Sequence, residues 1–199
     1  HLAVRRQRQM CIRDSSLFGV VMIASVTIPL TDGSISMTLN HIFKLILAIF
    51  IGLLIFRVSL STWKKIDISL IIFSFFLLTL VFFPVIGFEA NGASRWIRIL
   101  GFSFQPSELM KFSLIIYISS YCFRRMTEFK EKWLGFWKPV LVVISAIALV
   151  LVEPDLGSSA VIFLISLTIM LIAGAPLKQM LIIFFMGLSV FAVSYTHLT

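Results

Sequence analysis

Residues 91–111 read NGASRWIRILGFSFQPSELMK and lie between two long apolar stretches of the chain. They place Arg95, Arg98, Glu108 and Lys111 at the edge of those stretches. Ionisable groups inside an apolar span are costly unless they face partners or water. The chemistry of this chain is therefore expected at the boundary between a membrane and its surroundings.

The composition is that of a membrane protein. Of the 199 residues, 59% are hydrophobic and 13% are charged, and the mean hydropathy of +1.05 exceeds that of soluble domains. The formal net charge is +8, but the basic residues form short runs between apolar stretches, which orientation in a bilayer explains better than nucleic-acid binding. We predict an all-α, polytopic transmembrane bundle with no nucleic-acid partner.

The apolar stretches predict six to seven transmembrane helices, because a helix needs roughly 20 residues to cross a bilayer. The expected spans are residues 42–60, 66–83, 106–123, 139–152 and 158–173, with shorter ones at 17–30 and 180–193. The expected connections are loops at 31–40 and 88–105, a basic turn at 61–65, a basic Trp-rich loop at 124–138, and breaks at 153–157 and 174–179. Residues 16–193 then form one domain. The basic arm 1–15 and the tail 194–199 are either genuine or foreign to the natural protein.

The basic residues of the loops predict the orientation. Nine cations fall on one side of the expected bundle, namely Arg57, Lys64, Lys65, Arg124, Arg125, Lys130, Lys132, Lys138 and Lys178. The loops on the opposite side carry only Arg95 and Arg98. By the positive-inside rule the basic side is cytoplasmic, so the loop at 88–105 and the motif EPDLG at 153–157 share the outer face.

Three acidic and basic groups are candidates for a site on that face. Pro106 suits the first position of a helix, and Glu108 then lies in its first turn. Glu108 and Lys111 share a face because they are three residues apart. They form either an ion pair that anchors the helix or part of a polar cavity. Asp155 either joins them or caps the next helix.

Other residue types give weaker indications. Arg95 and Arg98 suit an anionic headgroup through their guanidinium groups, or are solvated loop cations. Trp96 either stacks on a sugar or anchors the loop at the interface. The two cysteines and three histidines lack ligand spacing, so neither a disulfide nor a metal site is predicted. Hydrolase, zinc-protease and nucleotide-binding motifs were also not found.

Three motifs in this order, NGASRWI, FQPSELMK and EPDLG, resemble the SEDS family of bacterial cell-wall polymerases, which includes FtsW, RodA and SpoVE. The resemblance covers residues 19–187. NGASRWI, YISSYCFRR at 117–125 and the stretch 153–179 are most similar to the cell-division branch, FtsW.

The resemblance implies a peptidoglycan glycosyltransferase. It would polymerise lipid II, a disaccharide-peptide on undecaprenyl diphosphate, at the outer face of the bacterial inner membrane. Its expected partners are a class B penicillin-binding protein, which is a transpeptidase, other division proteins and membrane lipids. No cofactor is implied, and a divalent cation stays open.

The resemblance also implies residue roles. Glu108, Lys111 and Asp155 match polar positions of the family's central cavity, with Lys111 the best candidate to stabilise the lipid diphosphate. The expected substrate-binding residues are Arg95, Trp96, Arg98, Gln105 and Ser107.

The chain departs from the family in one respect. Family members have about ten spans, and the aspartate usually assigned as the base lies in an outer loop beyond residue 199. The resemblance therefore implies an N-terminal fragment, inactive by itself. Two other functions stay open: a lipid II flippase, since transporters also need polar groups inside the membrane, and a scaffold that recruits the transpeptidase.

Overall fold

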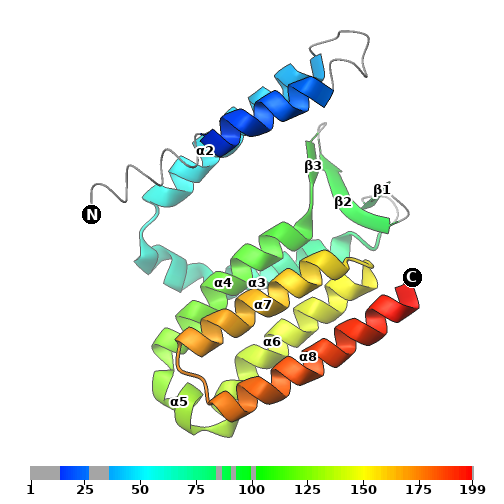
Figure 1. Cartoon of the computed structure of the whole chain (residues 1–199). Helices are drawn as coiled ribbons and strands as arrows, with labels where there is room; N and C mark the ends of the chain where they lie inside the picture. The colour runs from blue at the N-terminus through cyan, green and yellow to red at the C-terminus, as the bar shows by residue number, and fades with distance from the viewer. Residues whose placement is uncertain (1–13, 27–35, 84–86, 91–92, 100–101, 199) are drawn as a thin grey trace. The chain divides into compact units, whose positions relative to one another are not determined.

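The computed structural model describes residues 14–26, 36–83, 87–90, 93–99 and 102–198. It divides into two compact units, His1–Ser59 and Leu60–Thr199, which are described separately (Figure 1). Most of the basic arm, half of the loop expected at 31–40 and the turn at 91–92 lie outside the described residues.

The first unit contains a short apolar helix, Asp14–Val26, and helix α2, Ser36–Arg57. Helix α2 begins six residues before the expected span at residue 42. Its first turns hold polar residues, which suit the end of a helix because the first four N–H groups lack partners within it. The loop expected at 31–40 is correspondingly shorter.

The second unit is a bundle of five long helices (Figure 1). They are α3 (Leu60–Leu80), α4 (Pro106–Arg124), α6 (Trp133–Val152), α7 (Leu156–Ile172) and α8 (Leu177–Leu198), with the short α5 (Met126–Glu131) between α4 and α6. Helix α4 packs against α3, α6 and α7. It buries Met110, Leu114 and Ile118, which share a face because they are four residues apart. The predicted all-α bundle is confirmed.

Three of the helices in the described part of the chain are long and apolar enough to cross a membrane. These spans are Thr38–Arg57, Trp133–Val152 and Leu177–Ser194. Helix α7 is apolar but has 17 residues, and α3 and α4 carry charged residues toward their ends. The protein is therefore a membrane protein in which the charged helices lie among apolar ones.

The expected loop at 88–105 is wrong, because most of it forms a small antiparallel sheet. Its strands are β1 (Gly87–Ala90), β2 (Ala93–Ile99) and β3 (Phe102–Phe104), in the order β1-β2-β3. Trp96 pairs with Phe88, and Ile97 pairs with both Gly87 and Phe104. The pairing satisfies backbone groups between neighbouring strands, which explains ordered structure in a segment with many polar residues.

The start of α6 is also earlier than expected, since the helix begins at Trp133 and contains Pro139. Pro139 has no N–H to donate to the carbonyl of Gly135, four residues before it. The Tyr121 hydroxyl donates to that carbonyl instead, at 2.8 Å. A neighbouring helix therefore supplies the hydrogen bond that proline removes, and the chain stays helical.

The expected basic turn at 61–65 lies within α3. This helix pairs with α4 through two polar contacts. Asp67 is 1% exposed and accepts from Arg124 Nη2 at 2.6 Å. Nearer the middle of the helices, the hydroxyl oxygens of Ser74 and Ser113 are 2.6 Å apart and buried.

The bundle has two chemically different ends. One, the sheet end, holds β1–β3 and the starts of α4 and α7 (Figure 1). The other, the basic end, holds α5, the start of α6 and the turn from α7 to α8. The cations of the second unit at this end are Lys64, Lys65, Arg124, Arg125, Lys130, Lys132, Lys138 and Lys178. The fold thus gathers most of its cations opposite the candidate site.

Candidate functional site

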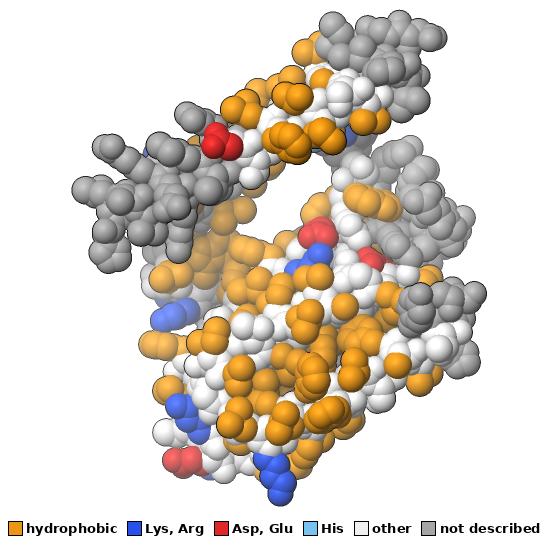
Figure 2. Space-filling model, in the orientation of Figure 1, with side chains coloured by type: hydrophobic (Ala, Val, Ile, Leu, Met, Phe, Trp, Pro, Cys, Tyr) orange, Lys and Arg blue, Asp and Glu red, His pale blue; other side chains and the backbone are white. Residues whose placement is uncertain are grey.

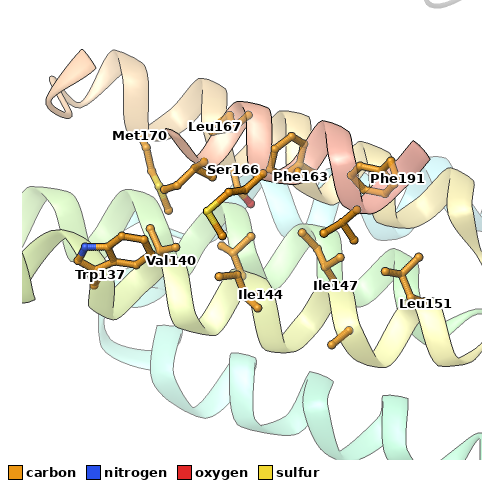
Figure 3. Close-up of a pocket in the computed structure, with 16 residues that line it drawn as sticks. Trp137, Val140, Ile144, Ile147, Leu151, Phe163, Ser166, Leu167, Met170 and Phe191 are labelled. Carbon is orange, nitrogen blue, oxygen red and sulfur yellow. The ribbon is translucent and has the colours of Figure 1, made fainter. Parts of the chain in front are cut away.

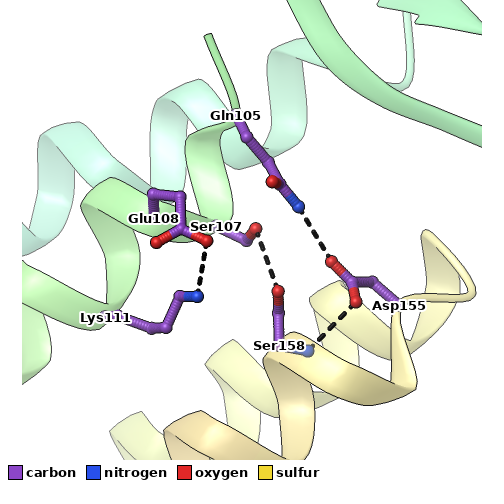
Figure 4. A network of polar contacts seen from close by, with 6 residues as sticks. All are labelled: Gln105, Ser107, Glu108, Lys111, Asp155 and Ser158. Carbon is purple, nitrogen blue, oxygen red and sulfur yellow. Dashed lines mark hydrogen bonds and ion pairs between the residues drawn. The ribbon is translucent and has the colours of Figure 1, made fainter. Parts of the chain in front are cut away.

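The candidate site forms where the starts of α4 and α7 meet at the sheet end (Figure 4). Gln105 precedes α4, and Asp155 is the N-cap of α7. Gln105 Nε2 donates to Asp155 Oδ2 at 2.9 Å, and the backbone N–H of Ser158 donates to Asp155 Oδ1 at 3.0 Å. Asp155 therefore caps its own helix and also accepts a hydrogen bond from Gln105 at the start of α4. A part for Asp155 alongside Glu108 and Lys111 stays a prediction.

A second contact links the same two helices two residues further along α4 and three residues further along α7. Ser107 Oγ donates to Ser158 Oγ at 3.5 Å, and both side chains are buried. The small hydroxyl side chains allow the helix starts to approach closely, as small residues do between membrane helices. Gln105 therefore contacts Asp155 directly, and Ser107 contacts Ser158, while the expected part of both residues in substrate binding stays a prediction.

Glu108 and Lys111 form an ion pair on α4, as their spacing predicts. Lys111 Nζ lies 2.6 Å from Glu108 Oε1, with Lys111 16% and Glu108 61% exposed. The more buried partner is thus the cation, held by a carboxylate that faces outward. An ammonium has three donors, so one carboxylate leaves donors for a further acceptor.

The Glu108–Lys111 ion pair is not bonded to the contacts that join Gln105 and Ser107 to α7. Within the described residues no ion pair joins Lys111 to Asp155. Figure 4 shows Lys111 and Glu108 beside the contacts from Gln105 and Ser107 to α7. The helix α4 itself holds them together, because Gln105 to Lys111 covers less than two turns.

Strand β2 carries the remaining candidates. Arg95, Trp96 and Arg98 belong to β2, which contacts α4. Trp96 is partly buried and its neighbour Ile97 is buried. The side chains of Arg95 and Arg98 lie outside the described part of the structure, so their role in binding stays a prediction.

Sequence reasoning missed several polar residues. Ser158 bonds to both Asp155 and Ser107, and Glu153, the first residue of EPDLG, is 2% exposed. The signal for Glu153 was present, because a second acid stood in the same motif. Asp67 was also visible as an acid inside an apolar stretch, which normally marks a partner. Its partner Arg124 is 57 residues away.

Among the residues that the structure describes, no three His, Cys, Asp or Glu side chains come together in a way that could hold a metal ion.

A family model for the FtsW/RodA/SpoVE proteins, described as "Cell cycle protein", matches residues 7–199. The chain belongs to this family. The match begins within the basic arm and includes the C-terminal tail.

Curated FtsW/RodA/SpoVE relatives carry a common name. The "Probable peptidoglycan glycosyltransferase FtsW" of Aliivibrio salmonicida (strain LFI1238) is 35% identical over 181 residues, which is 89% of this chain and 45% of that protein. The protein of the same name from Saccharophagus degradans is 42% identical over 138 residues, or 69% of this chain and 36% of that protein. The chain thus spans less than half the length of these relatives.

Solved structures of the family share the fold. The rod shape determining protein RodA of Thermus thermophilus superposes with a TM-score of 0.69 at 24% identity, covering 88% of this chain and 56% of RodA. A chain of a structure described as a peptidoglycan synthase complex gives a TM-score of 0.68 at 24% identity, covering 92% of this chain and 55% of its own length.

Proposed function

We propose that the complete protein is a peptidoglycan glycosyltransferase that polymerises lipid II during cell division. The observation that carries this proposal is a mostly buried lysine, Lys111, beside the polar contacts between α4 and α7, in a chain 35% and 42% identical to two proteins named FtsW. An ammonium of this kind suits the diphosphate of an isoprenoid-linked sugar.

In the proposed reaction, a hydroxyl oxygen of the acceptor sugar attacks the anomeric carbon of the donor. A new carbon–oxygen bond forms as the bond to the lipid diphosphate breaks. The proton of the hydroxyl passes to a base, and the diphosphate leaves with the bonding electron pair. Charge grows on the leaving oxygen, where positively charged donors stabilise the transition state most.

The residues of this chain have distinct parts in that proposal. Lys111 directs an ammonium at the leaving diphosphate, and Glu108 positions it through their 2.6 Å contact. Gln105, Ser107 and Asp155 hold the starts of α4 and α7 together. Arg95, Trp96 and Arg98 on β2 would bind the headgroup. The base of the reaction is not assigned to any residue of this chain.

The distribution of cations supports an outer location for the proposed polymerisation. The basic end of the bundle faces the cytoplasm by the positive-inside rule. The sheet end, with the candidate site, then lies at the outer face of the bacterial inner membrane. A class B penicillin-binding protein is the proposed transpeptidase partner.

The test is polymerisation of lipid II by the purified complete protein with that partner. We expect Lys111→Met to lower the rate at least about a hundredfold, because one stabilising donor is lost from the transition state. Lys65→Met is the matched control, since Lys65 lies at the basic end, and it should leave the rate unchanged. If the two variants polymerise lipid II at the same rate, Lys111 has no part in the reaction.

The same preparation separates the other functions. Translocation of labelled lipid II across liposomes without glycan products would favour a flippase. A scaffold predicts that Lys111→Met still supports glycan synthesis. Loss of synthesis with normal partner binding excludes the scaffold as the whole function.

A further inference from the structure

An apolar groove runs between α6, α7 and α8, away from the polar contacts of the candidate site (Figure 3). Its volume is about 220 Å³. The lining residues of α6 extend from Trp137 to Leu151, which corresponds to about 21 Å of helix. Four wall residues, Ile144, Ala148, Met186 and Val190, are exposed, so the groove opens to the surroundings of the bundle.

The length and walls of the groove suit a hydrocarbon chain. It follows about 21 Å of α6, a length that an extended acyl chain can occupy. The walls are almost wholly apolar, and the groove covers more than half of the roughly 30 Å thickness of a bilayer core.

Two polar groups in the walls lack hydrogen-bond partners. The indole Nε1 of Trp137 and the hydroxyl of Ser166 are buried, and neither makes a hydrogen bond in the structure. Both groups can donate a hydrogen. Buried donors of this kind are costly when unpaired, and a phospholipid offers the matching acceptors in its ester carbonyls and phosphate.

Cations lie at the basic end of the same groove. Lys130 reaches the turn from α7 to α8, since its Nζ is 3.0 Å from the position that a Cβ on Gly174 would occupy. Lys178 lines a neighbouring hollow on α8 together with Met186, which also lines the groove. Neither lysine forms a salt bridge with an acidic residue of the described chain.

Figure 2 shows hydrophobic side chains over this face of the second unit and Lys or Arg side chains at its lower edge. Trp133 and Trp137 lie about one turn apart at the start of α6, with tilted rings whose centroids are 5.6 Å apart. Tryptophan favours the depth of lipid headgroups. Basic pockets between membrane helices at such a depth bind anionic headgroups.

We propose that the groove between α6, α7 and α8 binds an acyl chain of an anionic phospholipid. The headgroup lies at the basic end, where Lys130 and Lys178 attract the phosphate and the Trp137 indole donates to it. This lipid site is separate from the candidate site at the sheet end. It does not depend on the glycosyltransferase proposal.

Native mass spectrometry of the complete protein in detergent tests the site. Phosphatidylglycerol and phosphatidylcholine with the same acyl chains are the probes. We expect tighter retention of phosphatidylglycerol, and about a fivefold weakening of that retention by Lys130→Gln or Lys178→Gln, as for one cation near a lipid surface. Lys65→Gln, on α3 at the basic end, is the charge control and should have less effect. Equal retention of both lipids, or an equal effect of all three substitutions, overturns the proposal.

Ala148, which lines the groove, gives a test of the acyl chain. Ala148→Phe should fill the groove and abolish retention of the bound lipid, while Leu141→Phe on the exposed face of α6 should not. If Ala148→Phe does not fold, a phospholipid with a photoreactive group in its acyl chain replaces it. We expect this probe to label α6 between residues 137 and 151 in the unaltered protein.

Two other occupants give distinct results. If another segment of the complete protein fills the groove, the photoreactive chain leaves α6 unlabelled. If a second copy fills it, Ala148→Phe converts a dimer to a monomer in light scattering without any dependence on lipid. Either result overturns the proposal.

Discussion

Asp155 combines two roles that are usually considered separately. One carboxylate oxygen caps α7 and the other accepts a hydrogen bond from Gln105 across the helix pair. The residue is 7% exposed. Its contribution to folding and its contribution to chemistry therefore need substitutions that remove one and keep the other.

Asp155→Asn and Asp155→Ala make this separation. Asparagine caps a helix about as well as aspartate, and the Gln105 amide can turn to present its oxygen, so we expect the free energy of unfolding to change by no more than about 0.5 kcal/mol. Alanine loses the cap and leaves a polar group unpaired, which should cost about 2 kcal/mol.

Thermal unfolding in detergent measures the stability, and lipid II polymerisation by the complete protein measures the activity. Since the proposed part of Asp155 is to hold the starts of α4 and α7 together, we expect Asp155→Asn to keep the fold and most of the activity, and Asp155→Ala to lose activity together with stability. Loss of activity in Asp155→Asn with an unchanged free energy of unfolding would contradict this and give the carboxylate charge a part in the reaction.

At the scale of elements, α3 and α4 are joined by the ion pair of Asp67 and Arg124. Arg124 also donates from Nη1 to the carbonyl of Lys64 at 3.1 Å. The carboxylate is 1% exposed and the guanidinium 40% exposed. The arginine is therefore partly solvated, whereas Asp67 depends on it to offset its burial.

Removing the cation alone should be the most damaging change in this pair. We expect Arg124→Gln to lower the free energy of unfolding by about 2 to 3 kcal/mol, less than for a fully buried pair because Arg124 reaches solvent. The double variant Asp67→Asn/Arg124→Gln should recover part of this loss, since no charge is left buried. Additive losses in thermal unfolding would show that the two residues are not coupled.

The helices were predictable where local pattern decides them. The spans of apolar residues and the i, i+3 spacing of Glu108 and Lys111 are visible along the sequence. The Tyr121 hydroxyl that accommodates Pro139 is not, because it comes from another helix. The pairing of β1, β2 and β3 was missed although its partners are close in sequence, such as Ala90 with Ala93. The Asn91-Gly92 dipeptide was a local signal for a hairpin.

At the scale of the molecule, the bundle places most of its cations at the end opposite its candidate site. Sequence reasoning placed the 88–105 segment and EPDLG on one side from the loop charges alone, and Gln105 contacts Asp155 although 50 residues separate them. The sequence could predict only that the two segments lie on the same side of the membrane. Which atoms bond, and that Ser158 takes part, depends on how α4 packs against α7.

The orientation of the bundle has a direct test. With Cys11 and Cys122 replaced by alanine, we introduce Ser103→Cys on β3 or Glu131→Cys at the end of α5, both at exposed positions. A membrane-impermeant maleimide should label Ser103→Cys in intact spheroplasts, because the basic end faces the cytoplasm. Glu131→Cys should react only after permeabilisation. The reverse pattern contradicts the proposed outer location of the site.

The buried pair of Ser74 and Ser113 has a consequence for the α3–α4 interface. Each hydroxyl also lies within hydrogen-bond distance of a carbonyl in its own helix, Ser74 of Leu70 at 2.9 Å and Ser113 of Leu109 at 2.8 Å. Two hydroxyl hydrogens thus serve three contacts, since each hydroxyl carries a single hydrogen. At any moment one of the three contacts has no hydrogen between its two oxygens, and rotation of the two hydroxyls changes which contact this is. The α3–α4 interface therefore keeps one helix spacing but has more than one hydrogen-bond pattern.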